Sequence, residues 1–301
     1  MEVTRYLPVG SSLVIGIFAL LVFRRYARRG GTHLLLWGIG LLMFGVASFA
    51  EAYSTFAWSP TVFRLWYLAG AVLVAAWLGQ GTVYLLSGQR LANVLAAAAL
   101  GYATAAVLFF GLSRTGLLTV RTAILLISFH GIIFGWAWYR RAVRRWHASR
   151  VTGTLTALLI AGSLVAAYLV FTVPLDAGRF NPAETLSAQY RESVGPGGER
   201  VPGILPPGAA IRRITPFFNI YGVMTLVGGA LYSAWLLWRK EIVPQRVVGN
   251  ILIAAGALAL GLASTLVRLG LSDYLYVGEF IAAVSMFGGF LLATTRPAAS
   301  P

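Results

Sequence analysis

Residues 34–53 read LLLWGIGLLMFGVASFAEAY, and only one residue of this stretch, Glu51, is charged. A run of about 20 apolar residues matches the hydrocarbon thickness of a bilayer, which is about 30 Å. The apolar residues are continuous rather than alternating, so the stretch does not fit a strand of an outer-membrane barrel. A helix satisfies its own backbone hydrogen bonds in lipid. The stretch therefore predicts a helix that spans a membrane.

Similar runs recur along the 301 residues, of which 58% are hydrophobic and 11% charged. Soluble domains carry about 25% charged residues. The sequence predicts an all-α fold, a polytopic transmembrane helical bundle of about nine spans, integral to the plasma (inner) membrane of a bacterium. The predicted spans are 8–23, 33–53, 61–87, 91–112, 117–139, 152–174, 216–238, 247–268 and 274–295.

The basic residues indicate the orientation of these spans. Cytoplasmic loops of membrane proteins are enriched in Lys and Arg. With the N-terminus outside and the C-terminus cytoplasmic, the inner segments hold 14 of the 24 cations and a single acid, Glu241. The net charge of +15 is thus concentrated on one side of the predicted membrane, which argues against nucleic acid as a partner. The densest basic run, Arg140–Arg150, is interleaved with Trp and Tyr and is expected to meet anionic lipid headgroups.

One long stretch is not membrane-like. We expect residues 1–174 to form six spans, residues 175–215 an outer-side loop, and residues 216–301 three further spans. The loop is expected to open with a short helix that Asn181 caps, with Pro182 at its first position and Glu184 at its third. The glycine- and proline-rich part that follows predicts irregular structure. A lid over a pocket, a docking surface for a protein partner and a passive linker are the alternatives for this loop.

Small residues indicate where the last two spans pack. Helices in lipid associate through small side chains that let their backbones approach. Because a few residues join these spans, we expect them to form an antiparallel pair. The predicted contact stripes are Ala254, Ala257, Gly261 and Ser264 in one helix and Gly278, Ala282, Ser285 and Gly289 in the other.

The remaining ionisable residues within the spans cluster at one depth, in the outer third of the membrane. Buried charges are costly there, and they either pair with each other or line a wet cavity. Two interpretations stay open, namely salt bridges that fix helix register and an outward-facing ligand-binding site. Glu279 lies deepest, and Arg268 is its expected partner. The candidate ligand-binding residues are Glu51, Arg64, Arg121, Arg268 and Glu279.

His130 is the one histidine well inside a predicted span. A pair of histidines at matching depth, as a membrane haem requires, is not present in the sequence. We expect His130 to be neutral and hydrogen-bonded to a neighbouring helix, with a role in a polar relay as the alternative. No metal-binding or nucleotide-binding motif occurs, and the absence of cysteine excludes thiolate sites. The sequence therefore predicts neither a metal nor a cofactor.

Residues 34–53 and 65–86 together resemble the multi-helix membrane sensor regions that precede some bacterial histidine kinases. The resemblance rests on helix length, on one acid and on an aromatic cluster. The cluster lies in the second stretch, which reads LWYLAGAVLVAAWLGQGTVYLL. It implies a membrane-embedded sensor region, although no kinase domain follows the last span.

The leading functional hypothesis is a non-enzymatic membrane protein that binds or transports a small molecule, ion or lipid through an outward-facing polar site. One alternative is an accessory, sensory or scaffold subunit of a larger membrane complex. The second alternative is an intramembrane enzyme, for which Glu279 and His130 would be the acid–base candidates.

Overall fold

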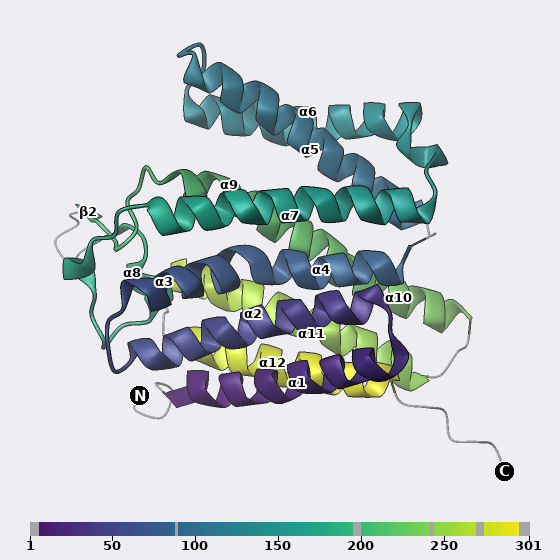
Figure 1. Cartoon of the computed structure of the whole chain (residues 1–301), viewed down its shortest axis with the longest axis horizontal. Helices are drawn as coiled ribbons and strands as arrows, with labels where there is room; N and C mark the ends of the chain where they lie inside the picture. Colours follow the sequence, from purple (N-terminus) through teal and green to yellow (C-terminus); the bar gives the residue numbers. More distant parts are fainter. Residues whose placement is uncertain (1–5, 88–89, 195–199, 241–243, 269–273, 295–301) are drawn as a thin grey trace. The chain divides into compact units, whose positions relative to one another are not determined.

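The computed structural model describes residues 6–87, 90–194, 200–240, 244–268 and 274–294. In these ranges the chain is almost entirely helical (Figure 1). Nine helices of the described part are long and apolar enough to cross a membrane, which confirms the predicted number of spans. The chain divides into two compact units, Met1–Thr82 with Gly162–Pro301 and Val83–Ala161, which we call the first and second unit.

The first unit holds most of the helices. Two of its spans are interrupted by a π-helical stretch, namely α3–η2–α4 and α9–η5–α10. Helices α4 and α7 continue into the second unit. The bounds are α1 Leu7–Arg29, α2 Thr32–Ser54, α3 Pro60–Trp66, η2 Tyr67–Leu73, α4 Val74–Leu85, α7 Ala148–Thr172, α9 Ala210–Gly222, η5 Val223–Val227, α10 Gly228–Arg239, α11 Pro244–Arg268 and α12 Tyr274–Thr294.

Besides the parts of α4 and α7 that it shares with the first unit, the second unit contains an antiparallel pair of helices with a short connection. Helix α5 covers Arg90–Arg114, α6 covers Val120–Arg141 and the 3₁₀ turn η3 covers Val143–Arg145. Gly101 lies so close to α6 that an added Cβ would come within 2.5 Å of the backbone at Gly131 and Gly135. Small residues thus let these two backbones approach, as expected for helices in lipid.

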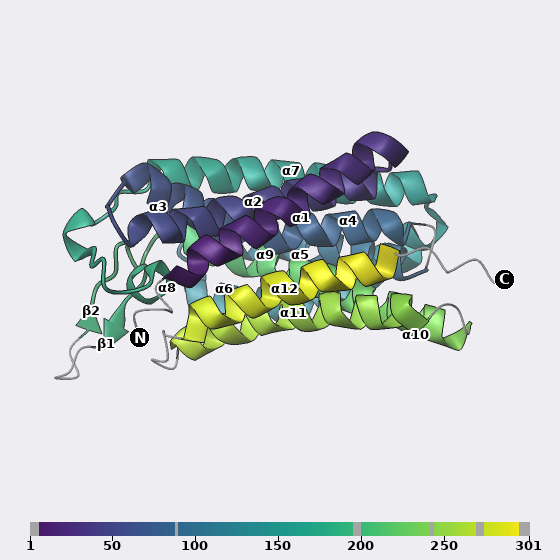
Figure 2. The same ribbon diagram turned by 90° about the horizontal axis from the view of Figure 1, so that it is seen from below.

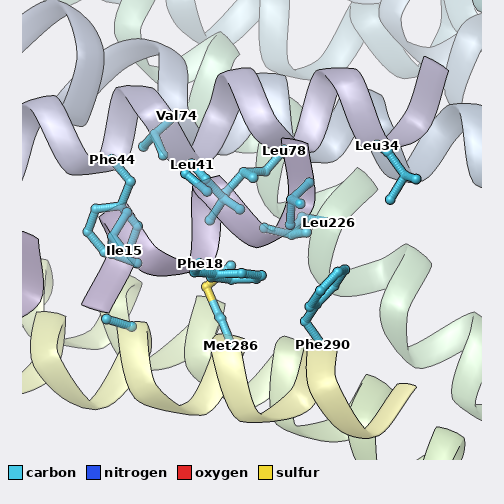
Figure 3. Close-up of a cluster of buried hydrophobic side chains, with 13 residues drawn as sticks. Ile15, Phe18, Leu34, Leu41, Phe44, Val74, Leu78, Leu226, Met286 and Phe290 are labelled. Atoms are coloured by element: carbon cyan, nitrogen blue, oxygen red, sulfur yellow. The ribbon is translucent and has the colours of Figure 1, made fainter. Parts of the chain in front are cut away.

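An apolar core joins α1, α2, α4, η5, α11 and α12 in the first unit. Figure 3 shows Phe18 of α1 between α2 and α12, with Met286 and Phe290 beside it. The Phe18 ring stacks on Phe287 with the centroids 5.2 Å apart. This core holds the helices that carry Glu51 and Glu279 in a fixed arrangement, because close-packed interiors resist displacement.

Helices α11 and α12 form the predicted antiparallel pair and lie side by side (Figure 2). An added Cβ at Gly249 would lie 2.5 Å from the backbone nitrogen of Ala293, and one at Gly278 would lie 2.4 Å from the Cβ of Ala263. The predicted stripe of α12 is therefore confirmed at Gly278. The predicted stripe of α11 was wrong at Gly261, whose added Cβ would meet open space.

The stretch between α7 and α9 contains a helix, but not where it was predicted. Helix α8 covers only Leu186–Gln189, and Thr185 caps it by accepting a hydrogen bond from the Ala188 amide at 3.2 Å. The Asn181 side chain instead accepts from the Ala183 amide at 3.0 Å, which closes a local turn and competes with a helix start. The region also contains the turn η4 (Ala177–Arg179) and strands β1 (Ser193–Val194) and β2 (Arg200–Val201), which pair antiparallel.

The seventh span begins earlier than predicted, at Ala210 rather than at residue 216. Pro216 lies inside α9 and does not end it. Proline is tolerated in membrane helices because neighbouring groups satisfy the freed backbone. The early start brings polar residues of α9 into the helical part of the first unit.

Large apolar side chains remain exposed along the spans. In α1, Leu13, Ile17 and Leu20 form one exposed face, and in α6, Leu125, Phe129 and Ile132 form another. Apolar faces of this extent are rare on soluble monomers and match a lipid environment. The chain is therefore a polytopic integral membrane protein.

Candidate functional site

A cavity of about 160 Å³ lies within the first unit, at the end where α8 packs against the spans. Its wall is built from α2, the α3–η2–α4 span, the α8 region, α9, α11 and α12. The lining residues are Phe44, Ala47, Ser48, Glu51, Trp66, Tyr67, Gly70, Ala71, Val74, Ser187, Tyr190, Arg191, Thr215, Asn219, Leu260 and Glu279.

Two carboxyl groups meet in this wall. Glu51 of α2 is 2% exposed and Glu279 of α12 is 8% exposed. Their side chains lie beside each other, and Oε1 of Glu51 accepts from the indole Nε1–H of Trp66 at 2.8 Å. Two neighbouring carboxyl groups can bond to each other when one of them carries a proton.

Two buried polar atoms of the same wall lack a hydrogen-bond partner among the described residues. They are Oε2 of Glu279 and the hydroxyl oxygen of Ser48, a residue that is 1% exposed. Unsatisfied buried polar atoms cost about 1–3 kcal/mol each and are rare in native structures. Both atoms belong to residues that line one cavity, so a polar ligand in that cavity lies beside the two residues.

A π-helical turn shapes the adjoining wall. Stretch η2 contributes Tyr67, Gly70 and Ala71, and Asn219 of α9 donates its side-chain amide to the Ala71 carbonyl at 3.2 Å. An added Cβ at Gly70 would lie 2.7 Å from the Cβ of Ala47, so only glycine lets η2 approach α2 this closely. Single π turns inside α-helices occur frequently at functional sites.

The α8 region covers one side of the cavity. Leu186 is buried, and the Tyr190 ring packs on Trp66 and Tyr67 with centroids 5.9 and 5.6 Å apart. Arg212 of α9 anchors this region, because its Nη2 donates to the Tyr190 carbonyl at 3.1 Å and to the Leu205 carbonyl at 2.8 Å. The ring contacts of Tyr190 with Trp66 and Tyr67 show that this segment lies against the spans.

The structure brings together two of the predicted ligand-binding residues, Glu51 and Glu279. Arg64 does not line the cavity. Its guanidinium donates to the carbonyls of Val170 at 3.1 Å and Val173 at 2.9 Å, at the C-terminal end of α7. These are helix-end carbonyls that lack an intrahelical partner, so Arg64 stabilises the end of α7.

The other candidates are placed only as helix positions. Arg121 lies in α6 of the second unit and Arg268 is the last residue of α11, and both side chains lie outside the described part. The expected contact of Arg268 with Glu279 therefore stays a prediction.

His130 lies in α6 of the second unit. Its Nδ1 contacts the Leu126 carbonyl of the same helix at 3.0 Å. The imidazole packs beside Phe109 and Phe129, with ring centroids 5.0 and 5.4 Å apart. Among the described residues, His130 is thus hydrogen-bonded within its own helix and not to a neighbouring helix as predicted, and the alternative relay role stays a prediction.

Sequence reasoning missed Ser48, Trp66 and Tyr67 as site residues. A signal existed for Ser48, because it lies three residues before Glu51 and therefore on the same helix face. No comparable signal marked Trp66, whose indole resembles the many aromatic residues at membrane interfaces. No protein-family model matches this chain, and comparisons with curated proteins and with solved structures find no match.

Proposed function

We propose that this integral membrane protein binds a small polar solute or ion in the cavity beside Glu51 and Glu279, as a receptor or carrier rather than as an enzyme. The observation that carries the proposal is the pair of unsatisfied buried atoms, Ser48 Oγ and Glu279 Oε2, in one cavity wall. A cavity with polar walls and room for a solute is the usual form of a small-molecule site. The Glu51–Glu279 pair supplies its polar end.

The cavity faces the outer side in this proposal. The support is the concentration of cations at the opposite ends of the spans, which follows the positive-inside rule. The α8 region then covers an outward-facing site, which is one of the roles considered for residues 175–215.

The orientation predicts which of two introduced cysteines a membrane-impermeant maleimide reaches. Ala183→Cys in the exposed stretch before α8 is expected to react in intact cells of the expression host. Ser149→Cys, exposed near the start of α7, is expected to react only after the cells are permeabilised. The chain has no cysteine, so each variant carries one thiol. The reverse pattern of labelling would contradict the orientation.

Thiol reactivity inside the cavity tests the binding proposal. We expect Ser48→Cys to react with the neutral reagent methyl methanethiosulfonate in lipid nanodiscs at least about tenfold faster than Ser11→Cys, because close-packed interiors exclude reagents. Ser11 is a matched control, since its hydroxyl is also buried and without a partner among the described residues, yet it does not line the cavity. Equal rates for the two thiols would show that no solute enters the cavity.

A further inference from the structure

Protein acceptors already receive hydrogen bonds from several donors at the carboxyl end of the cavity, whereas the Ser48 hydroxyl has no partner among the described residues. The Trp66 indole donates to Glu51 at 2.8 Å. The Asn219 amide nitrogen donates to the Ala71 carbonyl at 3.2 Å. Only the NH₂ group can donate to a carbonyl, so this contact fixes the orientation of the amide and leaves its oxygen as an acceptor.

The hydroxyl groups follow the same pattern. Thr215 donates its hydroxyl proton to the Ile211 carbonyl at 2.9 Å. Its contact with the Tyr67 hydroxyl, at 3.4 Å, therefore uses the tyrosine proton. Both hydroxyl oxygens keep lone pairs, but neither keeps a free proton. The carboxyl end of the cavity is thus rich in acceptors, and a ligand that satisfies it has to donate.

The charges of the wall favour a cationic donor at this end. Glu51 and Glu279 place two buried carboxyl groups side by side in the lining, and no ion pair to either of them is present among the described residues. Buried charges are normally paired. The other charged or titratable side chains of the lining are Tyr67, Tyr190 and Arg191. Arg191 lies over the Tyr190 ring at 5.8 Å, on the α8 side, so repulsion directs a cation toward the carboxyl pair.

A primary ammonium group fits this wall better than a metal ion. It carries three N–H donors, which match the free Oε2 of Glu279, the Ser48 hydroxyl oxygen and the Asn219 amide oxygen. A calcium ion takes six to eight oxygen ligands. The described residues contain no cluster of three or more His, Asp or Glu that could hold a metal.

Part of the cavity lining is apolar. It includes Phe44, Val74 and Leu260, and Figure 3 shows Phe44 and Val74 beside each other at one end of the core. A volume of about 160 Å³ is comparable to the engineered cavity of about 150 Å³ that binds benzene in a well-known lysozyme variant. A ligand of about six heavy atoms therefore fills the space, with a short hydrocarbon chain against the apolar part of the lining.

From these features we infer that the ligand is a primary ammonium group on a short alkyl chain, with the ammonium on Glu279, Glu51 and Ser48 and the chain against Phe44, Val74 and Leu260. The inference rests on the proposed binding function and adds the class of the solute. An alkylammonium ion bound there places a cation beside two buried carboxyl groups, and its binding stabilises the folded protein.

The test uses the full-length protein in lipid nanodiscs and four probes: n-butylammonium chloride, n-butanol, sodium n-butyrate and sodium chloride at matched ionic strength. We expect n-butylammonium to raise the thermal midpoint saturably, by about 3 °C at about ten times its Kd. n-Butanol has an alkyl chain without a charge, n-butyrate has a chain with the opposite charge, and sodium chloride has no chain. We expect no saturable rise of the thermal midpoint with these three probes. n-Butylammonium is also expected to slow the reaction of Ser48→Cys with the neutral reagent methyl methanethiosulfonate.

The two proposals fail separately in this design. Absence of a response to n-butylammonium, or an equal response to n-butanol, n-butyrate or sodium chloride, overturns the ammonium assignment. The proposed binding function is decided by the reactivity of Ser48→Cys against Ser11→Cys, which requires no assumption about the ligand. A saturable response to n-butylammonium that leaves the Ser48→Cys rate unchanged also overturns the assignment, because the ligand then binds elsewhere.

Discussion

Gly289→Leu is expected to lower the free energy of unfolding by about 3 kcal/mol or more, whereas Gly288→Leu, one residue earlier, is expected to leave it nearly unchanged. The difference follows from the two faces of α12. A Cβ added at Gly289 would lie 2.6 Å from the Gly249 carbonyl oxygen and 2.9 Å from the Ile253 backbone nitrogen. These are backbone atoms of α11, which move only if the helices separate.

Gly288 is a matched control because it has the same backbone conformation and the same neighbours in sequence. A Cβ added at Gly288 meets nothing within 4 Å, so a leucine there projects into open space that lipid fills in a membrane. Unfolding of each variant in mixed micelles, followed by tryptophan fluorescence, measures the difference. Equal destabilisation by both substitutions would mean that the close packing of α11 on α12 does not stabilise the first unit.

The spans were predictable because hydropathy is local. Each span needs only its own 20 or so residues to be recognised, and no knowledge of its neighbours. The start of the seventh span was missed because Pro216 lies inside α9, where proline removes a hydrogen bond without ending the helix. The two π-helical stretches had no local signal in the sequence. They arise where packing against other helices outweighs regular helix geometry.

The depth of the candidate site in the membrane was predictable from the sequence, but the contact between Glu51 and Glu279 was not. The positions of Glu51 and Glu279 near one end of their spans indicated that both lie at similar depth. Which helix faces meet depends on packing between α2 and α12, which are far apart in the sequence. A rule based on opposite charges also favours Arg268 for Glu279, whereas two carboxyl groups can bond through a shared proton.

Arg64 shows a different limit of the sequence. Its long side chain reaches the end of α7, more than 100 residues away in sequence, and donates to two backbone carbonyls. Free carbonyls at a helix end are strong acceptors that depend on where the helix stops and not on residue type. Arg64 was therefore predicted to bind a ligand because of its depth in the membrane, although its side chain stabilises the end of α7.

The double substitution Glu51→Gln with Glu279→Gln is expected to abolish the n-butylammonium response, with an affinity at least about 100-fold weaker, because hydrogen bonds and charge contacts to buried carboxylates contribute several kcal/mol. The unliganded thermal midpoint is expected to stay the same or to rise. Glutamine has the shape of glutamic acid, so the two amides can bond to each other and the Trp66 indole keeps an acceptor. Removing a buried charge without leaving an unpaired donor is neutral or stabilising.

The opposite signs of these two effects separate binding from structure. A residue that only fixes helix register loses stability when it is changed, whereas a binding residue loses affinity and leaves stability intact or improved. Glu184→Gln is the control, because Glu184 is an exposed acid before α8 that does not line the cavity, and it is expected to change neither quantity. A double variant that still responds to n-butylammonium would show that the carboxyl pair does not receive the cation. A double variant with a strongly lowered thermal midpoint would instead show that the carboxyl pair holds α2 against α12. Replacing the carboxyl groups of a binding site by two neutral amides of the same shape should not lower the stability of the protein.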